Sequence, residues 1–258
     1  MSSVTPGSGE EEGFLTHLIE LRTRLVRALT VVGIIMIGLL PFANKLYTLL
    51  ALPLLRKMPV GAHMIATEVT TPFFVPMKVA MMAAFLIALP YVLYQVWAFV
   101  APGLYSHEKR LVLPLVISST LLFYCGMAFA YFVVFPVVFG FITGVAPEGV
   151  SVMTDIDKYL GFVLTMFMAF GVTFEVPVAV VVLVRLGVVN VQTLKDIRRY
   201  VIVGAFVVGA IFTPPDVVSQ SMLALPLWLL YEVGILVATY WRPAPAAPDE
   251  PQRTLPRF

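Results

Sequence analysis

Six stretches of predominantly apolar residues divide the chain, and charged residues lie almost entirely between them. About 20 apolar residues in a helix are enough to cross the hydrocarbon core of a bilayer. The predicted spans cover residues 25–42, 73–93, 111–142, 160–184, 201–212 and 222–238. These runs lack the alternation of apolar and polar residues that is typical of a membrane β-barrel. The pattern therefore predicts an all-α, polytopic membrane protein with six transmembrane helices.

Several of these spans are expected to be irregular. Pro76 and Pro90 lie inside the second span and Pro136 breaks the third, which predicts kinked helices. The fifth and sixth spans are short. A run of twelve residues such as 201–212 reaches only about 18 Å, against a hydrocarbon core of about 30 Å. Either the bilayer thins locally around these two helices, or the fifth helix extends into its flanks.

Composition agrees with a membrane protein and excludes several classes of function. Of 258 residues, 60% are hydrophobic and 12% charged, whereas a soluble domain carries about 25% charged residues. A net charge of +2 does not indicate a nucleic-acid partner. The single cysteine cannot form an intrachain disulfide, and the three histidines lack metal-ligand spacing. No nucleotide-binding loop, nucleophile motif or metal motif is present, so we expect neither an enzyme nor a cofactor.

The distribution of basic residues predicts the orientation. Six spans place both termini on one side of the membrane, and that side carries twelve of the lysines and arginines, against five on the other. The positive-inside rule then assigns both termini to the cytoplasm. Residues 14–240 are expected to form one transmembrane domain, and residues 1–13 and the proline-rich segment 241–258 to be disordered cytoplasmic tails.

The segment before the first span, residues 14–25, is predicted to be an amphipathic helix that runs into the membrane. Its apolar face consists of Phe14, Leu18, Leu21 and Leu25. The other face consists of Thr16, Glu20, Arg24 and Arg27. Glu20 and Arg24 are four residues apart and can form a surface ion pair worth a few tenths of a kcal/mol. Spacing alone favours this structural role for Glu20.

The segment between the second and third spans, residues 94–110, combines aromatic side chains with a charged turn. The aromatic residues suit an interfacial belt at the membrane surface. Ser106 can cap the next helix, and Glu108 falls in the first turn of that helix, where an acid is favoured by the helix dipole. These residues, taken alone, again favour a structural role.

Glu175 lies near the middle of the fourth span, with no basic residue within seven positions on either side. A carboxylate at that depth costs several kcal/mol unless it is neutral, paired or hydrated. Pro177 has no backbone N–H, so the helix is expected to be locally open there. A proton-carrying role, a polar-substrate role and a structural hydrogen bond all remain open for Glu175.

The fifth and sixth spans carry polar residues in a strongly apolar context. Asp216 is placed to cap the sixth helix, and Glu232 to reach the membrane interface. Polar side chains of this kind also hold partner helices in membranes.

Five motifs, in this order, resemble the TatC family, the C subunit of the twin-arginine protein translocase. They are HLIELR at 17–22, YQVWAF at 94–99, GLYSHE at 103–108, FEVP at 174–177 and TPPD at 213–216. The similarity covers about residues 17–237. It implies a receptor in the bacterial inner membrane that binds twin-arginine signal peptides of folded cargo. It also implies that the protein is a scaffold for the single-span TatA and TatB subunits, and that several copies of it assemble in contact with membrane lipids. Export by this assembly would be driven by the proton-motive force.

The resemblance also implies roles for individual residues. Glu20 and Glu108 match two acids that meet the arginine pair, and two carboxylates can bind two guanidinium groups by charge-assisted hydrogen bonds. The signal-binding site would further include Arg22, Phe99 and His107. Glu175 matches an acid facing a hollow on the membrane-embedded concave side of the fold. The surface that docks the single-span subunits would include Thr213, Asp216, Gln220 and Glu232.

Two other functions fit the sequence less well. A proton-coupled small-molecule transporter centred on Glu175 would need repeat symmetry and several polar groups at mid-membrane, and the sequence shows neither. A structural subunit without a ligand site does not account for both cytoplasmic acids.

Overall fold

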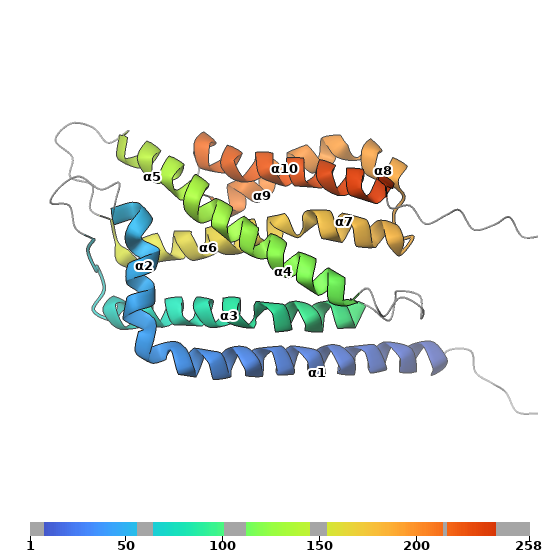
Figure 1. Cartoon of the computed structure of the whole chain (residues 1–258), viewed down its shortest axis with the longest axis horizontal. Coiled ribbons are helices and arrows are strands. Elements are labelled where there is room, and N and C mark those ends of the chain that lie inside the picture. Colours follow the sequence, from blue (N-terminus) through green and yellow to red (C-terminus); the bar gives the residue numbers. More distant parts are fainter. Residues whose placement is uncertain (1–7, 56–63, 101–111, 145–153, 214–215, 241–258) are drawn as a thin grey trace, which may run out of the picture.

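The described part of the chain is almost entirely helical. The structure, a computed structural model, describes residues 8–55, 64–100, 112–144, 154–213 and 216–240 (Figure 1). Five helical runs are long and apolar enough to cross a membrane: Thr16–Leu52, Thr71–Val100, Val112–Phe141, Ile156–Arg185 and Val217–Tyr240. The prediction of an all-α protein with several membrane-spanning helices is confirmed.

The first half of the described chain contains α1 (Ser8–Leu39), the short 3₁₀ helix η1 (Leu40–Phe42), α2 (Ala43–Leu55), α3 (Thr71–Val100), α4 (Val112–Phe129), the π-helical turn η4 (Ala130–Val134) and α5 (Phe135–Gly144). The second half contains α6 (Ile156–Phe174), α7 (Val176–Arg185), α8 (Val191–Asp196), α9 (Arg198–Phe212) and α10 (Val217–Tyr240). α1 begins at Ser8, inside the segment predicted to be a disordered tail. The predicted tail at 241–258 lies outside the described residues.

The fifth and sixth predicted spans differ in length. α9 has 15 residues, or about 22 Å, and is shorter than the runs that can cross a bilayer unaided. α10 has 24 residues, about 36 Å, so the expectation of a short sixth helix is wrong. The helix is longer mainly because it begins at Val217, directly after Asp216, which caps it by accepting the Ser219 N–H at 2.7 Å. Whether α9 makes a sixth crossing stays a prediction.

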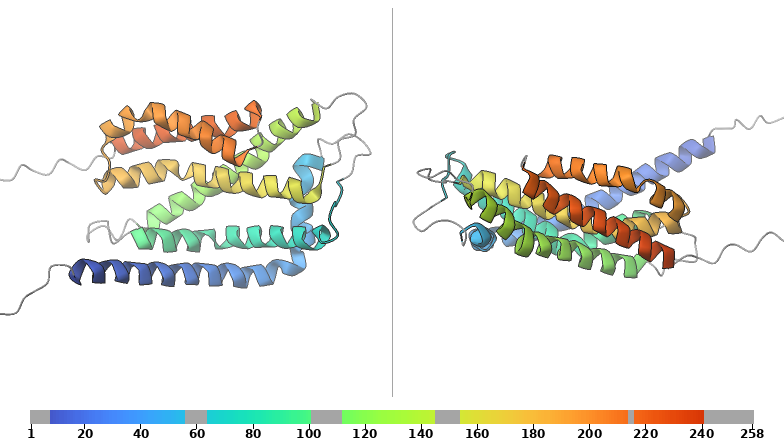
Figure 2. Two further views of the ribbon diagram at one scale, coloured as in Figure 1. Left: turned by 180° about the vertical axis from the view of Figure 1, so that it is seen from behind. Right: turned by 90° about the horizontal axis from the view of Figure 1, so that it is seen from above.

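The helices pack side by side, with α2 lying across one end (Figures 1 and 2). α1 packs on α3, α3 on α4, α4 on α6, and α10 on both α7 and α9. We call the end that contains the start of α1 and the last turns of α3, α7 and α10 the α1 end. The opposite end, with α2 and the first turns of α3 and α6, is the α2 end. α1 therefore starts, and α10 ends, at the same end of the molecule.

The prolines of α3 and α5 are accommodated without interrupting these helices. Pro90 lies inside the continuous helix α3, where its missing N–H leaves the Leu86 carbonyl without its usual helical donor. The Tyr124 hydroxyl of α4 donates to that carbonyl at 2.6 Å. In the third span the irregular turn is η4, just before Pro136, rather than a break at the proline itself. Side chains from neighbouring helices thus satisfy backbone groups that lipid cannot.

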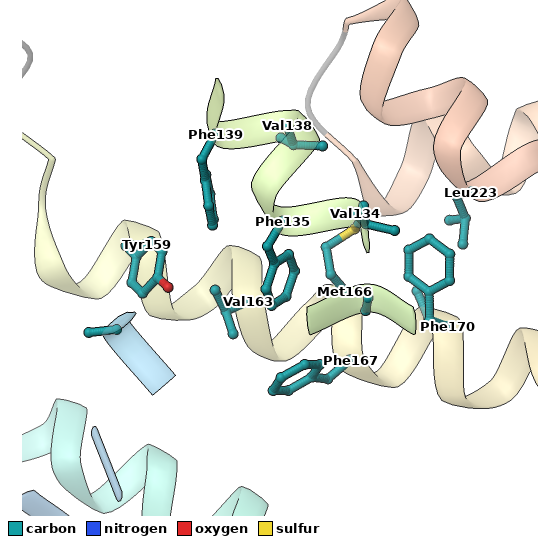
Figure 3. Close-up of a cluster of buried hydrophobic side chains, with 13 residues drawn as sticks. Val134, Phe135, Val138, Phe139, Tyr159, Val163, Met166, Phe167, Phe170 and Leu223 are labelled. Carbon is teal, nitrogen blue, oxygen red and sulfur yellow. The ribbon is translucent and has the colours of Figure 1, made fainter. Parts of the chain in front are cut away.

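The centre of the packing is a cluster of large apolar side chains between α5, α6 and α10 (Figure 3). Phe135, Met166, Phe170 and Leu223 are fully buried in it. α4 crosses α6 closely beside this cluster: a Cβ on Gly126 would lie 2.5 Å from the Phe170 carbonyl oxygen, and a Cβ on Gly171 would overlap the Phe123 ring. Small residues permit this approach, and close packing is what stabilises helix pairs in lipid.

Candidate functional site

Glu20 lies at the α1 end, on the side of α1 that faces α3. Its Oε1 accepts hydrogen bonds from Arg24 Nη2 at 2.6 Å and Arg24 Nε at 2.9 Å. Arg24 Nη1 approaches Gln95 Oε1 of α3 at 3.4 Å. The ion pair expected from spacing is confirmed, and it is also a contact between two helices. The Glu20 side chain is 35% exposed, and its Oε2 has no hydrogen-bond partner among the described residues.

Phe99 lies in the last turn of α3, and its ring stacks on that of His17 from α1. The ring centroids are 4.2 Å apart with an interplanar angle of 21°. His17 is three residues before Glu20 and therefore on the same face of α1. The structure thus brings Phe99 close to Glu20 through His17, a residue that the sequence analysis did not assign to the site. The spacing of residues 17, 20 and 24 was the signal that could have found it.

The other predicted signal-site residues are not brought to this position by the described structure. Arg22 is exposed and makes no ion pair or hydrogen bond with the described residues. Glu108 and His107 lie outside the described residues. The expectation of two neighbouring carboxylates therefore stays a prediction.

Glu175 forms the junction between α6 and α7. α6 ends at Phe174 and α7 begins at Val176, so the helix is interrupted beside Pro177, as expected. Both carboxyl oxygens of Glu175 are buried, and neither has a hydrogen-bond partner in the described part of the chain. The Ser119 side chain of α4 lies close enough to interact with this carboxyl, although the contact lacks hydrogen-bond geometry. The acid is therefore buried without a fully formed partner.

Polar side chains between α9 and α10 hold these two helices together. The Gln220 amide of α10 donates to the Phe206 carbonyl of α9 at 2.9 Å. The Thr213 hydroxyl donates within the end of α9, to the Gly209 carbonyl at 2.8 Å. Arg198 at the start of α9 pairs with Glu232 of α10 at 2.6 Å. Asp216 caps α10, as predicted. These contacts give the four predicted docking residues a role within the chain, and their role toward partner subunits stays a prediction.

The α2 end contains polar contacts that the sequence analysis missed. Asp155 caps α6, accepting the N–H groups of Asp157 at 2.9 Å and Lys158 at 3.0 Å, and it also binds Thr67 through the hydroxyl at 2.6 Å and the N–H at 3.1 Å. The hydrogen bond from the Thr67 hydroxyl, with those from the backbone, lowers the pKa of Asp155 from 3.8 to about 2. Beside it, Lys78 pairs with Asp157 at 2.6 Å.

No group of three His, Cys, Asp or Glu side chains within the described ranges is arranged to hold a metal ion.

The chain is similar to known proteins along most of its length. A family model described as Sec-independent protein translocase protein (TatC) matches residues 16–226. A TatC protein of Azotobacter chroococcum mcd 1 is 53% identical over 250 residues, covering 96% of this chain and 98% of the relative. A TatC protein of Escherichia coli K12 is 53% identical over 232 residues, covering 90% of each.

A crystal structure described as the twin-arginine translocase receptor TatC has the same fold. It superposes with a TM-score of 0.77 at 40% identity and covers 87% of this chain and 98% of its own. The chain belongs to the TatC family of Sec-independent protein translocase subunits.

Proposed function

We propose that this protein is the receptor subunit of a twin-arginine translocase in the bacterial inner membrane. It binds the paired arginines of export signal peptides at the α1 end and holds the single-span TatA and TatB subunits along α9 and α10. The family match, the relatives named as translocase proteins and the solved structure described as a receptor support this proposal.

The observation that carries the proposal is the half-satisfied carboxylate of Glu20. Arg24 fixes Oε1, while Oε2 is left to accept from another donor, and the side chain is 35% exposed. A guanidinium group binds a carboxylate by short, charge-assisted hydrogen bonds with a planar geometry. A lysine ammonium cannot reproduce that planar fork, which explains a preference for arginine.

The stacked rings of His17 and Phe99 complete the proposed site. They lie beside Glu20 at the junction of α1 and α3. An aromatic face attracts a guanidinium group and also packs against the apolar part of a signal peptide. Glu108 lies outside the described residues, four positions before the start of α4 at Val112. It is proposed as the second acid on the strength of the motif alone.

Both termini are proposed to be cytoplasmic. The start of α1 and the end of α10 lie at the same end of the molecule, and the loops assigned to that side carry most of the arginines and lysines (Figure 1). This arrangement needs α9 to serve as the sixth crossing. Its 15 residues span about 22 Å, so the bilayer must thin beside α9.

The outer face of α9 is proposed to dock the single-span subunits. Val203, Val207 and Ile211 are exposed along it, and Gln220 and Thr213 lie at the α9–α10 contact. An apolar face with a few polar groups suits a transmembrane partner helix. A proton-coupled transporter centred on Glu175 is not supported, because the relatives are named as translocase proteins.

Site-specific photo-crosslinking tests the proposed signal site. A photoreactive amino acid at Phe99 in the full-length protein in membrane vesicles should capture a twin-arginine signal peptide. Glu20→Gln should reduce this capture about tenfold or more, because one charge-assisted interaction contributes about 1.5–3 kcal/mol. Glu68→Gln is the matched control, since Glu68 is an exposed acid at the α2 end.

A twin-lysine peptide should be captured weakly by the parent protein and should show little further loss in Glu20→Gln. Equal capture of the twin-arginine peptide by the parent and by Glu20→Gln would contradict the assignment.

A further inference from the structure

Trp97 joins three helices around Glu175. Its indole Nε1 donates a hydrogen bond of 3.0 Å to the Ser119 hydroxyl oxygen of α4. Its ring packs against Val178 and Val182, which follow Glu175 on α7 by one and two turns. Trp97 of α3 therefore contacts both the helix that carries Ser119 and the helix that follows the intramembrane acid.

The Ser119 hydroxyl hydrogen is available to a further acceptor. The neighbouring hydroxyls of Ser118 and Thr120 donate to carbonyls of their own helix, at 3.0 and 2.7 Å. Ser119 makes no such bond among the described residues, and it accepts from Trp97 instead. A hydroxyl has one hydrogen to donate, so a fully buried Ser119 has a donor that needs an acceptor.

The acceptor that fits is the Glu175 carboxyl. Its two oxygens are buried without a hydrogen-bond partner in the described chain, which is costly for a carboxyl inside a membrane helix bundle. The two side chains already lie within interaction range of each other.

The backbone fixes the register between these two residues. α4 and α6 run in opposite directions and touch at Gly126 against Phe170 and at Phe123 against Gly171. The next turn along this crossing brings Ser119 opposite Glu175. A close crossing at two glycines allows little sliding, so the pair is held by the helices and not by flexible side chains.

We propose that Ser119 is a positioning residue for Glu175: its hydroxyl donates to the carboxyl while accepting from Trp97, which ties the intramembrane acid to the last turns of α3. This inference rests on the proposed function, because Phe99 of the signal site lies two residues after Trp97 on the same helix. If a bound signal peptide displaced the end of α3, Trp97 would move with it, and its contact with Ser119 would carry the change to Glu175.

Infrared spectroscopy of the full-length protein in lipid nanodiscs tests the hydrogen bond directly. In acidic buffer the C=O stretch of the protonated Glu175 carboxyl is identified as the band that disappears in Glu175→Gln. A hydrogen bond lowers this frequency, so Ser119→Ala should move the band to higher wavenumber. Trp97→Phe keeps the aromatic packing but removes the N–H, and should cause a smaller shift in the same direction.

Ser118→Ala is the matched control, since it removes a hydroxyl one residue away that bonds only to its own helix. It should leave the band unchanged, and Ser119→Thr, which keeps a hydroxyl, should leave it near the parent position. An unshifted band in Ser119→Ala, or an equal shift in Ser118→Ala, would overturn the proposal.

Export of a twin-arginine reporter in cells tests the functional link. Ser119→Ala should reduce export while crosslinking of the signal to position 99 is retained. Full export would overturn the link. Failure of the proposed signal site is detected separately from failure of this inference. Glu20→Gln changes the capture of the signal peptide, and it should leave the infrared band of Glu175 in place.

Discussion

The two ends of the molecule use their acidic side chains in opposite ways. At the α2 end, Asp155 accepts four hydrogen bonds from α6 and from Thr67, and the neighbouring Lys78 and Asp157 neutralise each other. At the α1 end, Glu20 is held through one oxygen, and the other has no hydrogen-bond partner among the described residues. Asp155 has its acceptors filled by internal contacts, whereas Glu20 keeps one available.

This difference separates the scaffold from the proposed receptor. A carboxylate whose hydrogen-bonding capacity is filled fixes the chain but has little left to bind a ligand. A carboxylate oriented by a single partner is preorganised for a guanidinium group at low entropic cost. The contrast predicts that substitutions at the α2 end change stability without changing signal capture, and that those at the α1 end do the reverse.

The largest loss of stability and of signal capture is expected from a substitution where α4 crosses α6, because this contact connects the α1 end with the α2 end. Gly126→Ala would force a methyl group against the Phe170 carbonyl, which belongs to the backbone and cannot rotate away. We expect the free energy of unfolding to fall by about 3 kcal/mol, and signal capture to fall with it. Gly140→Ala is the control, since nothing lies within 4 Å of the added methyl group. Apparent melting temperatures in detergent that are equal for the two variants would contradict this role of the crossing.

Asp155→Ala should loosen the α2 end alone. It removes the cap of α6 and the bonds to Thr67, so the apparent melting temperature should fall. Photo-crosslinking of a signal peptide to position 99, measured below the new melting temperature, should equal that of the parent protein. A loss of capture comparable to that of Glu20→Gln would break the contrast between the ends.

Tyr131→Phe should cause a smaller loss at the same end. The Tyr131 hydroxyl donates to the Leu49 carbonyl of α2 at 3.1 Å, and that carbonyl lacks its usual helical donor because residue 53 is proline. Removing the hydroxyl should lower the free energy of unfolding by about 1 kcal/mol. Tyr91→Phe is the comparison at another site, because the Tyr91 hydroxyl makes no hydrogen bond with the described residues. Thermal denaturation of the two variants side by side measures the difference.

The smallest expected effect is the pH dependence of protein stability that arises from Asp155 at the α2 end. Hydrogen bonds, first that of the Thr67 hydroxyl, lower the pKa of Asp155 from 3.8 to about 2 in the folded protein. The stabilisation that ionised Asp155 contributes is therefore complete above pH 3.8 and is lost as the pH falls toward about 2. Melting curves across this range should show a steeper loss for the parent than for Asp155→Asn, which has no proton to gain. Parallel curves would argue against the low pKa.

Local features of the fold and site could be predicted from the sequence. The Glu20–Arg24 pair, the Asp216 cap and the helix break at Glu175 all depend on residues within four positions of one another. Such contacts follow from helical geometry and the chemistry of proline. The sixth helix was predicted too short because the polar residues Ser219, Gln220 and Ser221 in its first turns were left out of the apolar run.

Contacts between distant segments could not be predicted in this way. His17 and Phe99 stack across more than 80 positions, and Thr67 reaches Asp155 across 88. Trp97 and Ser119 belong to helices whose relative rotation the sequence does not specify. Each of these pairs depends on how two helices are rotated and shifted against each other.

The sequence by itself determined that this chain is a helical membrane protein, since 60% hydrophobic residues in long runs leave the backbone few other ways to satisfy its hydrogen bonds. Its motifs determined the family. Tertiary structure decided which face of each helix turns inward. In α1 the apolar Leu18, Leu21 and Leu25 are exposed, while Glu20 and Arg24 turn toward α3. Lipid tails are as apolar as these side chains, so an apolar helix face gains no hydrophobic free energy by turning from lipid toward a neighbouring helix. Packing and hydrogen bonding, and not hydrophobicity, therefore orient the helix.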